Sequence, residues 1–324
     1  MKSFLPQKKC IIGLSPMDDV TDMPYRSVCK QFGADVVVTE FIASEALNRD
    51  AEKSLRKMLF DEGQRPLGIQ IFGSNEEELL QCLEIVEQRH PDFIDINWGC
   101  PVRKVAGKGA GSGMLREPDR LVAITASLVR RATLPVTVKT RLGYDESSKP
   151  IVELAERLQD VGVAALAIHG RTKAQMYRGT ADWTLIGAVK ENPRMHIPIF
   201  GNGDITTAAE AVAAHKRYGV DGILIGRAAI GNPWIFEQTQ RALRGEEERL
   251  VPVTERVEVC LRHLMAEVEF KGEHSAIFEM RKHYGGYFRN LRDFKQFRIP
   301  LVTVDSLDKI IPIFDDIKQF YADC

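Results

Sequence analysis

The sequence predicts an α/β protein, a (β/α)8 TIM barrel followed by a small all-helical domain at the C-terminal end. Three observations predict this fold. Eight apolar runs of strand length alternate with amphipathic segments, polar or glycine residues follow almost every run, and the strand pattern stops after Ala242. Near-continuous apolar strands separated by helices are typical of a parallel sheet covered on its outside, and eight such units form a TIM barrel. We expect the barrel over residues 1–244 and the helical domain over residues 245–324.

The expected strands are short, and the helices between them begin at recognisable signals. The strands cover residues 11–14, 35–39, 67–71, 93–97, 136–139, 165–169, 197–200 and 222–225. Between them, apolar side chains recur at helical spacing, as at Leu79, Leu83 and Val86. Capping boxes predict helix starts at Ser74-Asn75-Glu76-Glu77 and at Thr207-Ala208-Ala209-Glu210, and Pro118 predicts a first-turn proline.

Composition sets the general class of the protein. The net charge of −1 over 324 residues indicates no bulk affinity for nucleic acid, so any basic surface must be local. The six cysteines show neither metal-ligand spacing nor the density of a disulfide framework. The N-terminus lacks the apolar core of a signal peptide, and no run is long enough to span a membrane. We therefore expect a cytoplasmic protein that binds neither a metal ion nor a membrane. A monomer is expected as well, but the sequence leaves the oligomeric state open.

Polar or glycine-rich residues end the predicted strands. In chain order these ends are Ser15-Pro16-Met17, Glu40, Gln70, Asn97 with Cys100, Lys139 with Arg141, His169-Gly170-Arg171, Gly201-Asn202-Gly203-Asp204 and Gly226-Arg227. Any one of them could be an ordinary turn residue or a satisfied strand-end amide. In a TIM barrel, however, the carboxyl ends of all strands meet on one face. The sequence therefore predicts a ligand-filled mouth on that face.

Cys100 is the candidate for chemistry. It lies between Gly99 and Pro101 in an expected loop, and three basic side chains follow it before the first acid, Glu117. A thiol in an electropositive, partly exposed loop can act as a proton donor or a nucleophile. The alternative is a small buried core residue, which is the usual place of a cysteine. A turn between glycine and proline favours the chemical interpretation.

The last two strand ends predict a phosphate-bearing ligand. Gly201-Asn202-Gly203-Asp204 and Gly226-Arg227 offer backbone N–H groups that a ligand can approach and an arginine that can bind a phosphate, at the place where TIM barrels hold phosphates. Lys139 could form a Schiff base or place a positive charge against a flavin ring. With Gln70 available for the other edge of such a ring, we favour flavin mononucleotide (FMN).

Several motifs together resemble the tRNA-dihydrouridine synthases, in particular the bacterial B type. They are Asn97-Trp98-Gly99-Cys100-Pro101, Lys104-Val105, Lys139-Thr140-Arg141, His169-Gly170-Arg171-Thr172, Gly201-Asn202-Gly203-Asp204 and Gly226-Arg227-Ala228. Ser15-Pro16-Met17 resembles the end of the family's first strand, and the resemblance runs from about residue 10 past Arg281-Lys282-His283. Trp98 departs from the methionine that is common in this subgroup, which should alter packing more than chemistry.

The resemblance implies FMN-dependent reduction of uridine in tRNA, with NADPH as reductant. It makes Cys100 the acid that protonates C5 of the uracil while the reduced flavin delivers hydride to C6. A thiol with a pKa near neutrality can supply that proton, and the nearby cations are expected to tune the pKa of Cys100 toward it. The implied cofactor-binding residues are Ser15, Pro16, Met17, Gln70, Lys139, His169, Asn202, Gly203, Asp204, Gly226 and Arg227. The implied substrate-binding residues are Asn97, Arg141, Arg171, Arg178, Arg281 and Lys282. For Arg141, Arg171 and Arg178 the alternative is an ion pair with an acid on a neighbouring loop.

A local basic surface is expected in the helical domain. The stretch from residue 281 to residue 298 contains six lysines and arginines but a single acid, and aromatic residues are interspersed among them. These cations suit contacts to tRNA phosphates, although a solvated helix face is the plainer interpretation. The loop from Val102 to Gly113 is expected to close over an extruded uridine, with its glycines as hinges.

Two rival functions stay open at this point. One is a flavin-dependent dehydrogenase of a free pyrimidine, and the other is a barrel that binds tRNA without catalysis. The sequence leaves open which uridine of the tRNA is reduced and whether NADPH is preferred over NADH.

Overall fold

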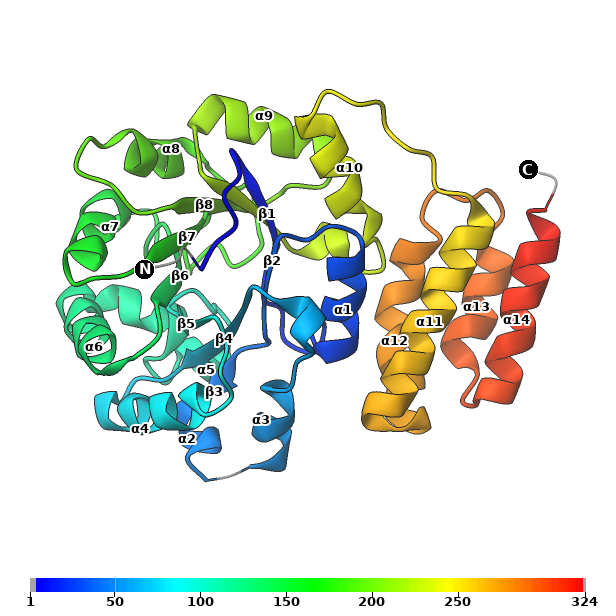
Figure 1. Ribbon diagram of the computed structural model, residues 1–324, viewed down its shortest axis with the longest axis horizontal. Helices are drawn as coiled ribbons and strands as arrows, with labels where there is room; N and C mark the ends of the chain where they lie inside the picture. The colour runs from blue at the N-terminus through cyan, green and yellow to red at the C-terminus, as the bar shows by residue number, and fades with distance from the viewer. Residues whose placement is uncertain (1–3, 50, 323–324) are drawn as a thin grey trace.

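The barrel confirms the predicted fold class. The structure is a computed structural model that describes residues 4–49 and 51–322 (Figure 1). Its strands are β1 (Ile11–Leu14), β2 (Val36–Val38), β3 (Ile42–Ala43), β4 (Leu67–Phe72), β5 (Phe93–Asn97), β6 (Val136–Arg141), β7 (Ala165–His169), β8 (Ile199–Asn202) and β9 (Gly222–Ile225). Parallel pairing follows the order β2-β1-β9-β8-β7-β6-β5-β4, and a β2–β4 pairing closes the ring.

Four of the eight predicted strands have the predicted bounds, and the others differ at their ends. Strand β8 begins and ends two residues later than expected, because Gly201 and Asn202 still pair with strand β7. Glycine and asparagine resemble turn residues in sequence, yet here they continue the ladder. The two-residue strand β3 was not predicted; it pairs with β4 outside the closed ring.

Helices cover the outside of the barrel, as Figure 1 shows. Those of the barrel are α1 (Met23–Gln31), α2 (Ser44–Leu47), α3 (Glu52–Lys57), α4 (Glu76–Glu87), α5 (Arg103–Ala106), α6 (Pro118–Arg131), α7 (Ile151–Asp160), α8 (Thr184–Glu191), α9 (Ala208–Tyr218) and α10 (Trp234–Leu243). Short 3-10 segments are η1 (Glu62–Gln64), η2 (Gly111–Arg116) and η3 (Arg227–Ala229). The segment expected as the loop 102–113 therefore contains α5 and the start of η2.

Two of the three predicted helix starts are confirmed. Pro118 occupies the first turn of α6, and Thr207 forms a capping box with Glu210 at the start of α9. The box predicted at Ser74 is wrong by one residue. Asn75 is the N-cap of α4, and its side chain accepts a hydrogen bond from the backbone N–H of Glu78 at 3.1 Å.

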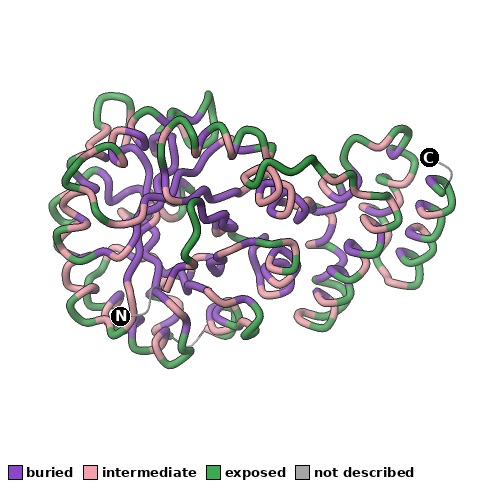
Figure 2. The backbone as a smooth tube through the Cα atoms, turned by 45° about the horizontal axis from the view of Figure 1, so that its top comes forward, coloured by how far each residue is buried: buried purple, intermediate pink, exposed green. Residues whose placement is uncertain are grey.

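Apolar side chains fill both faces of the strands. The larger core joins the outer strand faces to the helices, and a smaller one, including Ile11, Phe93 and Phe200, holds the side chains on the alternate strand face. A Cβ at Gly68 would overlap the ring of Phe93, so the absence of a side chain there makes room for that ring. Figure 2 shows the buried tube concentrated in the strands and on the inner sides of the helices. The barrel interior is thus a packed core, and space for a ligand lies at its mouth.

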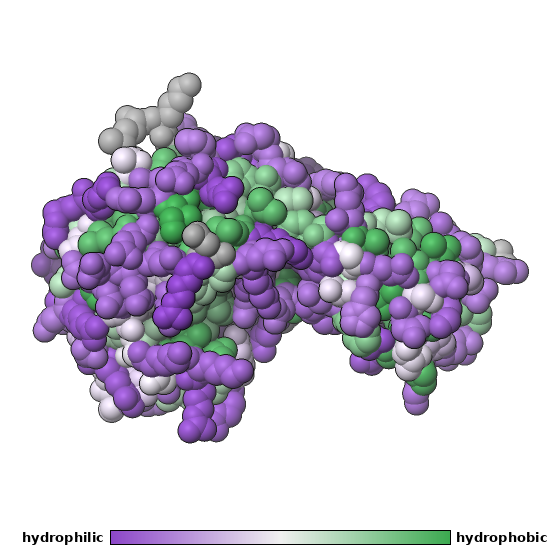
Figure 3. All heavy atoms as spheres, turned by 90° about the horizontal axis from the view of Figure 1, so that it is seen from below, coloured by the Kyte–Doolittle hydropathy of each residue, from purple (hydrophilic) through white to green (hydrophobic). Residues whose placement is uncertain are grey.

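The helical domain extends from one side of the barrel (Figures 1 and 3). It consists of α11 (Val253–Lys271), α12 (Glu273–Tyr287), α13 (Lys295–Thr303) and α14 (Leu307–Phe320). Helix α11 packs against α1 of the barrel. A Cβ at Gly286 in α12 would overlap the carbonyl oxygen of Ile230, which follows η3, so helix and barrel loop meet backbone to backbone. No helix among the described residues has the length and apolarity needed to cross a membrane.

Candidate active site

A cavity of about 1140 Å³ opens at the carboxyl ends of the barrel strands. It brings together most of the residues that the sequence singles out. The predicted site residues that line it are Ser15, Pro16, Met17, Asn97, Cys100, Lys139, Arg141, His169, Asn202, Gly203, Asp204, Gly226 and Arg227. Those that do not line it are Gln70, Arg171, Arg178, Arg281 and Lys282. The strand-end prediction therefore found a real cavity, although it assigned some residues to the wrong surroundings.

Cys100 lies in a tightly bonded turn that follows β5. The side-chain oxygen of Asn97 accepts hydrogen bonds from the backbone N–H groups of Gly99 at 2.9 Å and Cys100 at 2.8 Å. The Ser112 hydroxyl donates to the Cys100 carbonyl at 2.8 Å, which joins η2 to the same turn. These bonds orient the thiol toward a cavity that Cys100 itself lines.

The environment of the Cys100 thiol differs from the sequence expectation. The residue is 5% exposed, not partly exposed, and burial raises the pKa of the thiol above its ordinary value although Arg141 and Lys139 lower it. The expectation of a pKa near neutrality is wrong, because desolvation outweighs the nearby cations. At neutral pH the sulfur keeps its proton, which is the state that a general acid needs.

A chain of buried hydrogen bonds supports this turn from inside the barrel. Thr137 donates to one oxygen of Asp95 at 2.5 Å, and Gln70 Nε2 donates to the other at 2.5 Å. Asn97 Nδ2 in turn donates to Gln70 Oε1 at 2.8 Å. Gln70 is fully buried, and its amide faces its neighbours on β5, not the cavity. The chain connects strands β4, β5 and β6 to the backbone of Cys100.

Three basic side chains form the floor of the cavity. Lys139 Nζ donates to Asn202 Oδ1 at 3.1 Å. Arg141 donates to the Gly99 carbonyl at 2.8 Å and to the carbonyls of Thr172 and Met176 at 3.0 and 2.8 Å. Burial, together with Arg141, lowers the pKa of Lys139 to about 8. Burial, Arg141 and Lys139 also hold the pKa of His169 well below its ordinary value, so this imidazole is neutral.

Asp204 is the acid that the cations at the rear of the cavity share. Arg171 binds it through two bonds of 2.9 and 2.7 Å, and Arg227 donates to it at 3.0 Å. Arg171 also donates to the carbonyls of Arg178 and Gly179 at 3.1 and 2.6 Å. Arg171 is thus committed to holding the loop after β7. Arg227, which is exposed and lines the cavity, remains able to bind a ligand.

The other predicted substrate residues lie away from the cavity. Arg178 is exposed and donates to the Ala174 carbonyl at 3.3 Å. Arg281 donates to the Val304 carbonyl at 3.1 Å and its guanidinium carbon lies 4.0 Å from the centre of the Phe278 ring. Lys282 donates to the Asp19 carbonyl of the barrel. The last two bonds are structural, within the helical domain and between the domains.

The lining also contains residues that were not predicted as site residues, among them Phe41, Lys53, Lys57, Tyr177 and Arg289. Lys53 and Lys57 lie on α3, within the connection from β2 to β4, where no strand end marks them. Tyr177 follows β7 by eight residues and its ring lies 5.7 Å from the guanidinium carbon of Arg141 and 5.2 Å from that of Arg227. Arg289 carried one available signal, its place in the basic stretch of the helical domain.

The charge and shape of the cavity fit a flavin phosphate. Lys139, Arg141 and Arg227 line it. Arg227 pairs with Asp204, whereas Lys139 bonds to the Asn202 amide oxygen and Arg141 to backbone carbonyls, so a bound anion would relieve the mutual repulsion of these cations. Gly203 adopts a φ of 123°, and a Cβ there would lie 2.7 Å from Ala181 and 2.9 Å from the His169 ring. The absence of a side chain at this position lets the cavity-lining backbone pack directly against Ala181 and His169.

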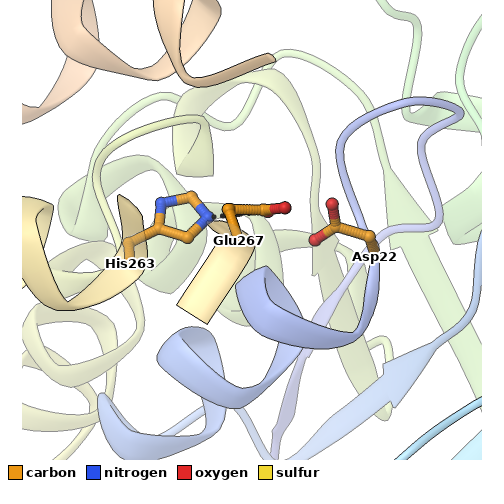
Figure 4. Close-up of side chains that lie close together, drawn as sticks. All are labelled: Asp22, His263 and Glu267. Carbon is orange, nitrogen blue, oxygen red and sulfur yellow. Dashed lines mark hydrogen bonds and ion pairs between the residues drawn. The ribbon is translucent and has the colours of Figure 1, made fainter. Parts of the chain in front are cut away.

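A second polar cluster lies between the domains and is structural. Figure 4 shows His263 and Glu267 of α11 beside Asp22, the N-cap of α1. These side chains are of metal-binding type and lie close together. The ammonium of Lys271, however, lies 2.5 Å from Asp22 and 2.8 Å from Glu267 and supplies the positive charge that both carboxylates need. The cluster binds the helical domain to the barrel.

Fold and cavity together define an enzyme of the (β/α)8 class whose ligands lie at the carboxyl ends of the strands. Solved structures agree on the fold. A 2-naphthoyl-CoA reductase complex superposes with a TM-score of 0.54 at 10% identity, over 73% of this chain and 50% of that chain. A morphinone reductase mutant superposes with a TM-score of 0.52 at 11% identity, over 74% of this chain and 88% of that chain.

The particular family follows from sequence comparison. The model of the family described as Dihydrouridine synthase (Dus) matches residues 13–316. tRNA-dihydrouridine synthase B of Pseudomonas aeruginosa is 36% identical over 96% of this chain and 92% of its own. The enzyme of the same name from Vibrio vulnificus is 35% identical over 94% of this chain and 96% of its own. The chain belongs to the dihydrouridine synthase family, and this membership implies a flavin cofactor.

Proposed function

We propose that this protein reduces specific uridines of tRNA to 5,6-dihydrouridine, with FMN as cofactor and NADPH as reductant. The family and the arrangement of the cavity support this function. One observation carries most of the argument: a protonated thiol, Cys100, lines a cavity whose floor and rear are cationic. Such a cavity suits an anionic cofactor and a reaction that ends in proton donation.

The residues that would hold FMN come from the ends of several strands. Gly203, Gly226 and Arg227 suit its phosphate, because they combine open backbone with an exposed guanidinium group. Lys139 and His169 suit its ring, and Ser15, Pro16 and Met17, with Asn202 and Asp204, complete the lining. FMN, when bound, supplies the hydride that adds to C6 of the uracil. Gln70 supports the site through Asn97 and is not among the residues that we assign to direct contact.

Cys100 supplies the proton in this proposal. Hydride addition at C6 leaves negative charge conjugated to the C4 carbonyl, and protonation at C5 removes it. The thiol is protonated before the reaction because burial raises its pKa. Arg141 stabilises the thiolate that remains, since its positive charge acts to lower that pKa. Asn97 positions the thiol through the backbone and is also the candidate to meet the uracil edge.

Binding of the tRNA falls to the helical domain and the rim of the cavity. Arg281 and Lys282 are engaged within the fold, so the remaining cations of the basic stretch, Arg289, Arg292, Lys295 and Arg298, are the better candidates for phosphate contacts. The enzyme would act as a monomer in the cytoplasm, where tRNA and NADPH are both present.

The test is an anaerobic absorption experiment on the purified protein loaded with FMN. NADPH should bleach the flavin bands, and unmodified tRNA should restore them while dihydrouridine appears in the RNA. Fully dihydrouridylated tRNA should restore nothing. Recovery with free uracil or uridine would instead support a dehydrogenase of free pyrimidines. A protein that binds tRNA but never reoxidises in its presence would contradict the proposed catalysis.

A further inference from the structure

Arg289 is the one described residue outside the barrel that lines the catalytic cavity. It follows the last turn of α12 and is exposed. Its backbone is fixed, because Arg256 of α11 donates to its carbonyl at 3.0 Å and the preceding Phe288 stacks on Phe294 with ring centres 4.7 Å apart. Helix α12 therefore delivers a charged side chain to the mouth of the barrel from a separate domain.

The contact between the domains holds Arg289 in that place. Gly286, three residues earlier, packs against the carbonyl oxygen of Ile230, and Lys282 bonds to the Asp19 carbonyl after β1. Ile230 lies three residues after Arg227, so the end of α12 rests on the loop that bears the proposed phosphate site. Movement of α12 relative to the barrel would disturb both contacts.

Three cations of the cavity lining pair with acids, and within the described part of the chain Arg289 does not. Arg227 pairs with Asp204 at 3.0 Å, Lys53 with Asp19 at 4.0 Å, and Lys57 with Glu40 at 3.3 Å. Throughout residues 4–49 and 51–322, no acid pairs with the guanidinium group of Arg289. One charged neighbour is another cation, Arg256, whose pKa is lowered by burial and by the charge of Arg289.

An unpaired arginine at the mouth of an enzyme suits a phosphate group, which it can bind with two parallel hydrogen bonds. Two phosphates are available in the proposed reaction, that of FMN and those of the tRNA backbone. The barrel provides for the first with Gly203, Gly226 and Arg227. A uridine that enters the cavity from a folded tRNA brings its own flanking phosphates to the mouth, because the base must leave its stack while the backbone stays outside.

We propose that Arg289 binds a backbone phosphate beside the target uridine and so positions the base over the cavity. The inference rests on the proposed function and names one residue of the substrate site. Arg289 thereby connects the domain that receives the tRNA to the place where the reaction occurs.

The test compares Arg289→Ala and Arg289→Lys with Arg262→Ala, an exposed arginine of α11 that does not line the cavity. For Arg289→Ala, KM for unmodified tRNA should rise about tenfold, as expected for one charge-assisted hydrogen-bonded contact. The slope of log affinity for tRNA against log salt concentration should fall by about one. Arg289→Lys should recover part of both effects, and Arg262→Ala should match the wild type.

FMN content and the rate of flavin reduction by NADPH without tRNA should stay unchanged in all three variants. Loss of FMN from Arg289→Ala would assign the residue to the cofactor and overturn the proposal. A wild-type KM and salt slope in that variant would overturn it as well. If the wild-type protein itself fails to reoxidise with tRNA, the proposed function fails, and this outcome is visible before any variant is compared.

Discussion

The cavity at the barrel mouth and the cluster between the domains both contain basic and acidic side chains. Basic groups are in excess in the cavity, and acidic groups are in excess in the cluster. At the mouth, Lys139, Arg141 and Arg227 line a space large enough for a ligand, and of the three it is Arg227 that pairs with Asp204. In the cluster, Lys271 lies between the buried carboxylates of Asp22 and Glu267. At the mouth, Lys139 and Arg141 have no carboxylate partner among the described residues, whereas in the cluster each buried carboxylate has an ion-pair partner within the protein.

The difference teaches how to separate a ligand site from a structural one when both contain perturbed groups. Burial and neighbouring Glu267 raise the pKa of Asp22, while burial and Arg141 lower that of Lys139. The shifts alone do not distinguish the two places, since ion-pair networks and functional sites both perturb pKa values. What distinguishes the two places is whether each charged side chain finds an oppositely charged partner within the protein.

The largest effect is expected at the mouth, from Cys100→Ala. Removal of the general acid should lower kcat for tRNA reduction by about 10³-fold, within the range for a positioned proton donor. FMN content and reduction by NADPH should persist, because Cys100 is not assigned to the cofactor. Single-turnover reoxidation of the reduced flavin by tRNA measures the effect. Cys10→Ala, which replaces a buried cysteine before β1, is the control and should keep full activity. A fully active Cys100→Ala protein would remove the thiol from the mechanism.

The next effect concerns stability and should appear in the cluster. Lys271→Met leaves two buried carboxylates without their cation and should lower the free energy of unfolding by about 3–5 kcal/mol. Replacing Asp22→Asn and Glu267→Gln in the same protein should restore more than half of the loss, since no uncompensated charge then remains. Urea unfolding measures all three proteins.

Lys139→Met provides the matched change at the mouth. In the FMN-free protein it should alter the free energy of unfolding by less than about 1 kcal/mol, because this lysine has no carboxylate partner to strand. Equal losses for Lys271→Met and Lys139→Met would break the comparison.

Much of the fold and of the mouth could be predicted from the sequence. The strand alternation and the polar strand ends are local signals, and barrel geometry alone brings those ends together. The resemblance to the family added roles that the residue types could not give. The N-cap prediction that was one residue early at Ser74 and the late end of β8 reflect local ambiguity, since Asn75 and Gly201 each suit two structures.

What the sequence could not give depends on contacts between distant residues. Gln70 was placed in the cofactor site, yet its partners Asp95 and Asn97 lie 25 and 27 residues away and turn its amide inward. Arg171 was expected at the substrate, yet Asp204 holds it 33 residues along the chain. Burial of Cys100, and with it the rise of its pKa, depends on how η2 packs over the turn. Arg289 reaches the cavity only through the docking of a second domain.

The charge of Lys139 should also make cofactor binding dependent on pH. Its pKa in the free protein is lowered to about 8, so the ammonium loses its proton as the pH rises through that value. FMN affinity should therefore be nearly constant from pH 7 to about 7.5 and fall above about pH 8, at most tenfold per pH unit. Fluorescence titration of the FMN-free protein measures it. Lys139→Met should bind FMN more weakly but with a flat profile over this range. The same fall in Lys139→Met would assign the dependence to another group.

The smallest effect is expected in the buried hydrogen-bond network that runs from Thr137 to the Cys100 turn. This network combines features of the cavity and of the cluster between the domains. The polar groups of this hydrogen-bonded network find their partners within the barrel, as the carboxylates of the cluster find theirs in Lys271. The network nevertheless ends at the turn that carries the Cys100 thiol. Thr137→Val removes the bond to Asp95 and should lower the free energy of unfolding by about 1–2 kcal/mol. If the network also positions the thiol, kcat should fall about twofold, because each remaining bond still restrains the turn.

Thr239→Val is the matched control for this last variant, since it removes a buried hydroxyl that donates to the Ile235 carbonyl at 2.6 Å within α10. It should cost about as much stability by the same reasoning, but leave kcat unchanged. Equal kcat in the two variants would make the network purely structural, like the cluster between the domains. A lower kcat in Thr137→Val alone would mean that an internally satisfied network can still serve the reaction when it ends at the cavity. Satisfied bonding within the protein would then account for the stability of such a network, and its contact with the cavity would determine whether it also contributes to the reaction.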